Sequence, residues 1–152
     1  MAFQPPPVTK LELNDDIKNA VNGALESGHP IVIGYVADNG YPHLSFRGST
    51  QVHGPQQLAI WVRNPEGGFL KTIAERPKVS LLYLNHSGTP AFLSFRGQAR
   101  IDPSANDSVY GNAPKREQEQ DPEKRGAAVI IELDSVDGFG ASGPFRMEHD
   151  AS

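Results

Sequence analysis

Residues 40–84 read GYPHLSFRGSTQVHGPQQLAIWVRNPEGGFLKTIAERPKVSLLYL, and they are the most informative part of the chain about its fold. Two segments of strand-like composition, Pro42–Val52 and Leu58–Arg63, are separated by a His-Gly-Pro turn. A loop with two glycines then leads into a short amphipathic helix that ends at Pro77, because proline cannot continue a helix. Val79–Leu84 forms the next strand. This order predicts a sheet protein in which turns and one short helix connect the strands.

Strands of the same kind occur on both sides of this stretch. The apolar, β-branched runs cover Ile31–Ala37, Ala91–Ile101 and Ala127–Leu133. Together with the three central strands they make six, joined mostly by short turns and interrupted by few helices. Because no regular alternation of strand and helix is present, the pattern predicts a mainly β fold, an antiparallel barrel.

The two ends of the chain and one internal segment have a different character. Residues 1–13 contain three consecutive prolines and are predicted to form an extended arm, while residues 14–152 form a single domain. Asn14 is a typical N-cap for a helix that ends at Gly28. The polar segment Asp102–Gly126 is either a solvated helix pair or a mobile loop, and the glycine-rich tail after it is expected to be irregular.

Composition argues against several classes of protein, among them disulfide-bonded, nucleic-acid-binding and membrane-spanning ones. The chain has 152 residues, 15 glycines, 13 prolines and no cysteine, which excludes disulfides and thiolate chemistry. Its net charge of -4 argues against general nucleic-acid binding, which needs a basic face. No apolar run is long enough to span a membrane, and the first residues do not resemble a signal peptide. We therefore expect a cytoplasmic protein with neither nucleic acid nor membrane as a partner.

Several cations and hydroxyls lie within the stretch quoted first. Arg47 and Ser49 share one face of a predicted strand, Arg63 ends the next strand, and Lys71 lies on the helix that follows. The order of these elements brings the four side chains within reach of one another. Cations and hydroxyls gathered at one place are typical of a phosphate-binding site. The competing interpretation is that Arg47 and Lys71 are ordinary exposed residues.

One pentapeptide, LSFRG, occurs at Leu44–Gly48 and again at Leu93–Gly97. Two copies do not make a repeat architecture, which needs three or more units. Coincidence is the simpler interpretation, and the functional alternative is that Arg47 and Arg96 edge the same cleft.

The central stretch resembles the flavin-binding split-barrel superfamily, which includes the pyridoxamine 5'-phosphate oxidase-like proteins. The elements that carry the resemblance are Gly40-x-Pro42, the strand Leu58–Arg63, Lys71, Arg76-Pro77 and the strand Val79–Leu84. It covers roughly residues 15–101. The family commonly has Asn-Pro where this chain has Arg76-Pro77, and an arginine and a lysine of the oxidases themselves fall at Ser45 and Thr50. This departure argues against pyridoxamine phosphate oxidase activity.

The resemblance implies a six-stranded antiparallel split β-barrel with a few short flanking helices, and a homodimer with the cofactor at the interface. The cofactor that the resemblance implies is FMN, with a deazaflavin coenzyme or haem as alternatives. Lys71 would meet the cofactor phosphate, and Arg63 would lie beside the flavin ring. Trp61 and Val62 alternate faces, so that only one of them can contact the ring. The cofactor-binding candidates are Arg47, Ser49, Trp61, Val62, Arg63 and Lys71.

These features predict an oxidoreductase that transfers a hydride between a flavin or deazaflavin and an unidentified small molecule. No catalytic residue is predicted, because no side chain is an obvious proton donor. The five histidines are scattered without the spacing of metal ligands, so no metal site is expected. One alternative is a non-catalytic protein that binds flavin or haem, and another is a scaffold dimer without cofactor.

Overall fold

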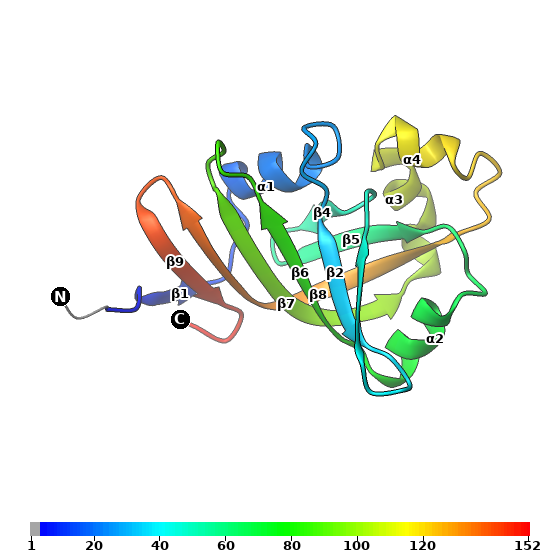
Figure 1. Cartoon of the computed structure of the whole chain (residues 1–152), viewed down its shortest axis with the longest axis horizontal. Helices are drawn as coiled ribbons and strands as arrows, with labels where there is room; N and C mark the ends of the chain where they lie inside the picture. The colour runs from blue at the N-terminus through cyan, green and yellow to red at the C-terminus, as the bar shows by residue number, and fades with distance from the viewer. Residues whose placement is uncertain (1–3) are drawn as a thin grey trace.

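The computed structural model describes residues 4–152, which form one mixed sheet of nine strands flanked by short helices (Figure 1). The strands are β1 (Val8–Lys10), β2 (Val32–Val36), β3 (Pro42–Phe46), β4 (Gln51–Gly54), β5 (Gln57–Val62), β6 (Lys78–Leu84), β7 (Phe92–Ile101), β8 (Ala127–Gly140) and β9 (Gly143–Glu148). The helices are α1 (Asp15–Asn22), α2 (Gly68–Glu75), the 3-10 turn η1 (Pro103–Ala105), α3 (Asn106–Asn112) and α4 (Lys115–Glu119).

The sheet curls into a barrel that stays open along one line. Strands β3, β2, β6, β7 and β8 pair in that order, and the first half of β8 continues to β5 and then β4. The second half of β8 instead pairs with β9, which pairs in parallel with β1. Within residues 4–152, β3 and β4 form no ladder with each other, although only residues 47–50 separate them. The barrel is therefore split between these two strands.

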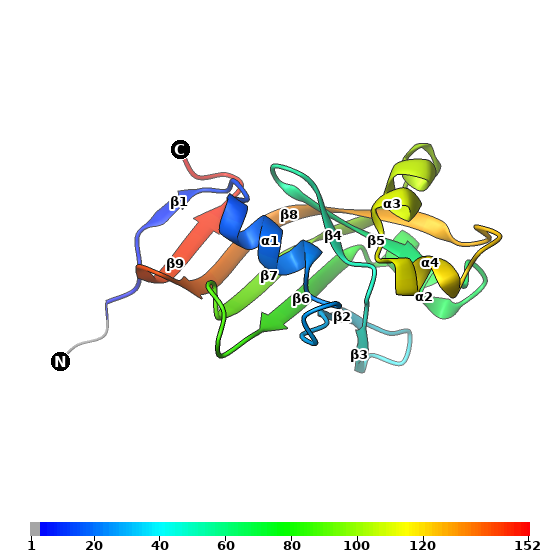
Figure 2. The ribbon, with the colours of Figure 1, turned by 90° about the horizontal axis from the view of Figure 1, so that it is seen from above.

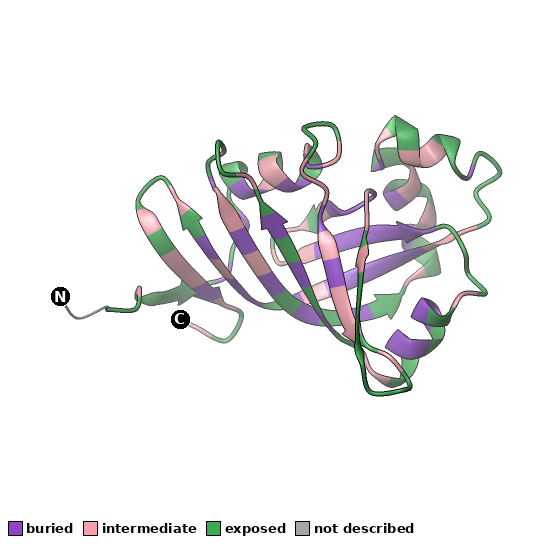
Figure 3. Ribbon diagram, viewed as in Figure 1, coloured by how far each residue is buried: buried purple, intermediate pink, exposed green. Residues whose placement is uncertain are grey.

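Burial follows the alternation of side chains along the strands (Figure 3). In β6, Val79, Leu81 and Tyr83 face the core while the residues between them are exposed. β5 is different, because nearly all of it is buried. Its inward residues join the main core, and Ala59 and Trp61 on its other face pack in a second cluster beneath α3. Both faces of β5 are thus covered.

Helices cover the remaining openings. The Asn14 side chain caps α1 by accepting a hydrogen bond from Ile17 N at 3.0 Å, as its residue type predicts. α1 buries Ile17 and Val21 against the core and packs on β4. Figure 2 shows α3 and α4 together at one end of the molecule and β1 with β9 at the other.

The fold class expected from the sequence is confirmed, but the sheet has nine strands rather than six. The predicted strand Pro42–Val52 is two strands, because the chain turns at residues 47–50. The predicted strand Ala127–Leu133 continues to Gly140 as β8. The tail expected to be irregular forms β9, where Arg146 pairs with Asp137 across the ladder. The polar segment 102–126 contains η1, α3 and α4, which agrees with the helical alternative.

The predicted N-terminal arm lies partly outside the described residues, since residues 1–3 are not described. Within the rest, Val8–Lys10 is β1, and Leu11 and Leu13 are fully buried in the main core.

Candidate functional site

A hollow of about 420 Å³ opens at the end of the barrel where β3 and β4 part. It combines two cations, two aromatic rings and exposed backbone. Its lining residues are Tyr35, Arg47, Val62, Arg63, Asn64, Gly67, Gly68 and Phe69. They come from β2, the β3–β4 connection, the end of β5 and the start of α2, so only the folded chain brings them together.

Arg47 lies at the turn that splits the barrel. Its N–H donates to Ile31 O at 2.8 Å, and its carbonyl accepts from Thr50 N at 3.1 Å and Thr50 Oγ1 at 2.7 Å. This turn directs the side chain across the ring of Phe69, with the guanidinium carbon 4.6 Å from the ring centroid. Within residues 4–152, the buried Nε of Arg47 has no hydrogen-bond partner. A buried donor of this kind is costly unless a ligand satisfies it.

Burial lowers the pKa of Arg47, and the nearby charge of Arg63 lowers it further, whereas Tyr35 and Glu117 act in the opposite direction. Arginine nevertheless stays protonated, because its unperturbed pKa is so high. The positive charge of Arg47 is therefore partly removed from water and only partly offset by nearby negative groups. An anionic ligand group would offset the rest of this charge.

Arg63 and Asn64 close another side of the hollow at the end of β5. Arg63 is half exposed, donates from Nη1 to Gln120 Oε1 at 3.2 Å, and forms an ion pair with Glu117 at 3.8 Å. The Asn64 carbonyl accepts from Gly67 N at 3.2 Å and thereby turns the chain into α2. Arg63 is therefore held at the rim by α4, while Asn64 shapes the loop.

The N-terminus of α2 borders the same hollow. Its N-cap is Gly67, and no side chain caps the helix. A Cβ atom at Gly68 would meet no other atom within 4 Å, so this backbone is open to a ligand. The first N–H groups of a helix and the helix dipole both favour an anion at this position.

Ser49 and Trp61 are not part of the hollow. Ser49 is buried and ties the β3–β4 turn to β5, since its Oγ donates to Trp61 O at 3.1 Å and accepts from Trp61 N at 2.8 Å. The Trp61 ring packs beneath α3 against Tyr110, and its Nε1 donates to Asp121 at 2.9 Å. Trp61 and Val62 do alternate, and Val62 is the one that lines the hollow.

Lys71 lies on α2 but is exposed, and it does not line the hollow. The structure therefore brings Arg47, Val62 and Arg63 together and leaves Ser49, Trp61 and Lys71 outside. Tyr35 and Phe69 were missed as site residues, since an aromatic in a strand or on an inner helix face is usually core. The Gly67-Gly68 pair at the start of α2 was the available signal for open backbone.

A second hollow of about 540 Å³ lies on the outer face of the sheet. Arg96 lines it together with Gly34, Leu44 and Ser135. The two LSFRG arginines thus edge different hollows, which both include Tyr35. The surface around the second hollow is apolar: Leu44 is 70% and Phe46 69% exposed on the edge strand β3. Other exposed apolar residues of the neighbouring strands are Val36, Leu82 and Leu84.

Residues 4–152 contain neither a metal-binding cluster nor a membrane-spanning helix. No group of three or more histidine, cysteine or acidic side chains is placed to hold a metal ion. No helix in this part of the chain is both long and apolar enough to cross a membrane.

Comparison with solved structures identifies the fold. HupZ of Group A Streptococcus matches with a TM-score of 0.60 and 16% identity, over 86% of this chain and 96% of that chain. A Clostridium acetobutylicum protein of the pyridoxine phosphate oxidase family, related to general stress protein 26, matches with a TM-score of 0.61 and 13% identity. That match covers 90% of this chain and 98% of the other. The fold is the split β-barrel of the pyridoxamine phosphate oxidase-like proteins.

The same split barrel occurs in an FMN-binding protein from Syntrophomonas wolfei, with a TM-score of 0.55 and 8% identity. That match covers 78% of this chain and 83% of the other. No family model matches the sequence. No curated protein matches it either. At these identities the likeness establishes the fold alone.

Proposed function

We propose that this split barrel binds a phosphate-bearing flavin, FMN, in the hollow at the β3–β4 split. The observation that carries the proposal is the buried Nε of Arg47, which has no hydrogen-bond partner within the described chain. The open N-terminus of α2 borders the same hollow and supplies backbone donors. A phosphate group satisfies both, because it offers several charged acceptor oxygens to a guanidinium and to amides.

The remaining lining residues suit the rest of such a ligand. Tyr35 and Phe69 lie with ring centroids 5.0 Å apart, and Val62 adds apolar surface. Arg63 and Asn64 place polar groups at the rim. The chain therefore offers an anion anchor beside an apolar wall, as expected for a ligand with a charged end and a ring system. The FMN-binding protein from Syntrophomonas wolfei supports the proposal by its fold.

We propose further that the chain is a homodimer that uses the outer face of β2, β3 and β6. An edge strand with exposed Leu44 and Phe46 leaves both unpaired backbone groups and apolar surface in water. A second copy would cover both. Tyr35 is a lining residue of both hollows, so the proposed interface adjoins the proposed flavin site.

The activity that we propose is an oxidoreductase reaction on a small molecule. A bound flavin supplies the redox chemistry by accepting and donating a hydride. The chain's own residues anchor the phosphate, hold the rim and exclude water from the apolar wall. A deazaflavin coenzyme also carries phosphate and would use the same anchor. A non-catalytic flavin carrier uses the same residues and differs only in lacking turnover.

The test is titration of the purified chain with FMN, riboflavin, the deazaflavin coenzyme and haem, followed by absorbance and fluorescence. We expect FMN to bind at micromolar concentration or below, and riboflavin more weakly because it lacks the phosphate. Tighter binding of the deazaflavin coenzyme would replace FMN as the proposed cofactor and would leave the proposed phosphate site unchanged. Binding of haem alone, or of none of the four, would overturn the proposal.

A further inference from the structure

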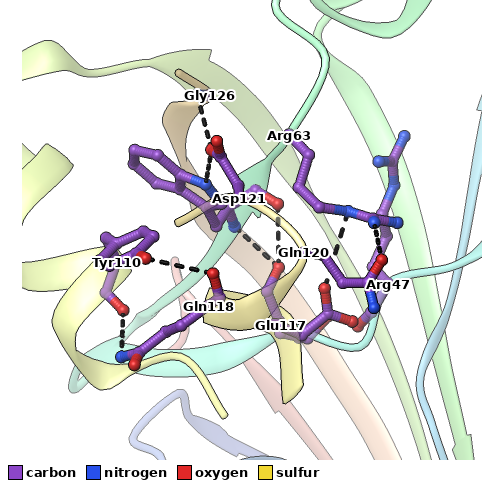
Figure 4. A network of polar contacts seen from close by, with 11 residues as sticks. Arg47, Arg63, Tyr110, Glu117, Gln118, Gln120, Asp121 and Gly126 are labelled. Atoms are coloured by element: carbon purple, nitrogen blue, oxygen red, sulfur yellow. Dashed lines mark hydrogen bonds and ion pairs between the residues drawn. The ribbon is translucent and has the colours of Figure 1, made fainter. Parts of the chain in front are cut away.

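The anion site described above contains a carboxylate from the chain itself. Glu117 extends from α4 to the rim of the hollow, and its Oε2 lies 3.8 Å from Arg63 Nε (Figure 4). Its side chain is only 17% exposed. Glu117 also raises the pKa of Arg47, which means that its negative charge acts on both arginines of the site.

A glycine makes room for this carboxylate. A Cβ atom at Gly48, the residue after Arg47, would overlap Glu117 Oε1. Glu117 Oε1 therefore lies directly against the backbone of the turn that positions Arg47. Since the φ of Gly48 is not in the left-handed region, close approach is the structural reason for a glycine there.

The helix that carries Glu117 is fixed to α3 through Gln118 and, just beyond its end, to the barrel through Asp121. Gln118 Nε2 donates to Tyr110 O at 2.9 Å, and Tyr110 Oη donates to Gln118 O at 3.2 Å. Asp121 then accepts bonds from the chain at Trp61 and Gly126, both at 2.9 Å (Figure 4). The backbone around Glu117 is thus held, and its carboxylate stays beside the arginines unless its side chain rotates.

The charges at the site follow from these positions. Arg47 and Arg63 contribute two positive charges, and Glu117 offsets one of them. A phosphate monoester carries about -1.5 to -2 at neutral pH, so it meets a carboxylate of like sign at the rim. Like charges brought together at a binding site weaken association and select against the wrong ligands.

We propose that Glu117 is a specificity residue of the anion site: it competes with the ligand's anionic group for Arg63 and Arg47, so that the affinity lost to Glu117 grows with the ligand's negative charge. The proposal rests on the hollow being the anion site of the proposed function. Glu117 reduces affinity for ligands with several negative charges more than for singly charged or neutral ones. The ligand class accepted best carries a single phosphate.

The test uses Glu117→Gln, which keeps the shape of the side chain and removes its charge. Glu119→Gln is the matched control, because Glu119 is exposed on the same helix and loses the same charge. FMN, riboflavin and inorganic pyrophosphate are titrated into the full-length wild type and both variants. We expect Glu117→Gln to tighten pyrophosphate and FMN on the order of tenfold and to leave riboflavin unchanged. Glu119→Gln should change none of the three.

Two results would overturn the inference. Unchanged or weaker pyrophosphate binding in Glu117→Gln would mean that Glu117 only positions Arg63, and an equal gain in Glu119→Gln would mean that net charge alone matters. The pyrophosphate titration decides this even if no flavin binds to the wild type, an outcome that would refute only the proposed flavin function.

Gly48→Ala provides a second variant in case Glu117→Gln folds poorly. The added methyl group displaces the Glu117 carboxylate, which is the end of a flexible side chain. We expect it to tighten pyrophosphate in the same direction, and no gain in a folded Gly48→Ala protein would contradict the inference.

Discussion

Asp121 accepts a hydrogen bond from the indole Nε1 of Trp61 at 2.9 Å, and this contact fastens the polar segment 102–126 to the barrel. The same carboxylate accepts from Arg125 N and Gly126 N, both at 2.9 Å. Asp121 is only 7% exposed and organises the end of the segment that carries Glu117. A side chain in a charged stretch, which the sequence predicts to be solvated or mobile, thus helps to build the candidate site.

Asp121→Asn should destabilise the protein. Burial would raise the pKa of Asp121, but hydrogen bonds from Arg125, Trp61 and Gly126 outweigh it, so the pKa lies below its usual value. The stabilisation is present above about pH 4, where an unfolded aspartate is charged, and is lost as the pH falls through the lower folded-state pKa. We expect a loss of about 1–3 kcal/mol at pH 7. Urea unfolding at pH 7 and pH 3 should show the difference shrinking in acid.

Asp107→Asn is the control for this experiment, because Asp107 is exposed in the first turn of α3 within the same polar segment. Its effect should stay within about 0.5 kcal/mol. Equal losses in both variants would contradict a special role for Asp121.

Arg47→Ala should weaken FMN by about 1.5–3 kcal/mol, the scale of a hydrogen bond to a charged group, which is roughly 10- to 100-fold. Riboflavin should be little affected, because it has no phosphate. Lys71→Ala, measured beside it, should have the smaller effect on FMN, since Lys71 is exposed and outside the hollow. Fluorescence titration of both variants with FMN and riboflavin shows which of the two side chains binds the phosphate. A larger loss of FMN affinity in Lys71→Ala than in Arg47→Ala would mean that the phosphate binds beside Lys71 and not in the hollow.

Ser49→Ala should lower stability and leave flavin affinity unchanged. The hydroxyl bridges the N–H and C=O of Trp61, so its removal leaves buried backbone groups unpaired. We expect a cost of about 1–3 kcal/mol in the free energy of unfolding. Chemical unfolding measures the change in stability, and FMN titration of the folded variant measures the flavin affinity. A variant of wild-type stability that binds FMN poorly would instead assign Ser49 to the ligand.

Phe46→Asp should convert the proposed dimer to a monomer. Phe46 is 69% exposed on β3, so a charge there disturbs an interface without disturbing the core. Sedimentation velocity at micromolar concentration measures the change in mass. Ile101→Asp is the control, because Ile101 is also exposed and apolar but lies on β7, which does not pair with β3. A wild type that sediments as a monomer would refute the interface itself.

The sequence was sufficient where a single local pattern decides the structure. Strand-like composition between turn signals predicted β6 and β7, and the Asn14 cap predicted the start of α1. It was insufficient for the end of β8 and for β9, because the glycine-rich tail is typical of an irregular segment, whereas in the fold Gly138 of β8 packs against Phe145 of β9. The turn at residues 47–50 was also missed, since its strand-like residues are bent by bonds to Ile31 and Thr50.

By itself, the sequence determined that this chain is mainly β and that it carries arginines in its central stretch. Strand alternation and turn chemistry are local, and neighbouring residues suffice to specify them. Only the tertiary structure decided which polar groups meet. It turned Ser49 and Trp61 into the protein, placed Arg47 on Phe69, and brought Glu117 across 68 intervening residues to Gly48. The physical reason is that the barrel brings together the ends of strands that are far apart in the sequence. Local sequence patterns do not specify which of these ends meet.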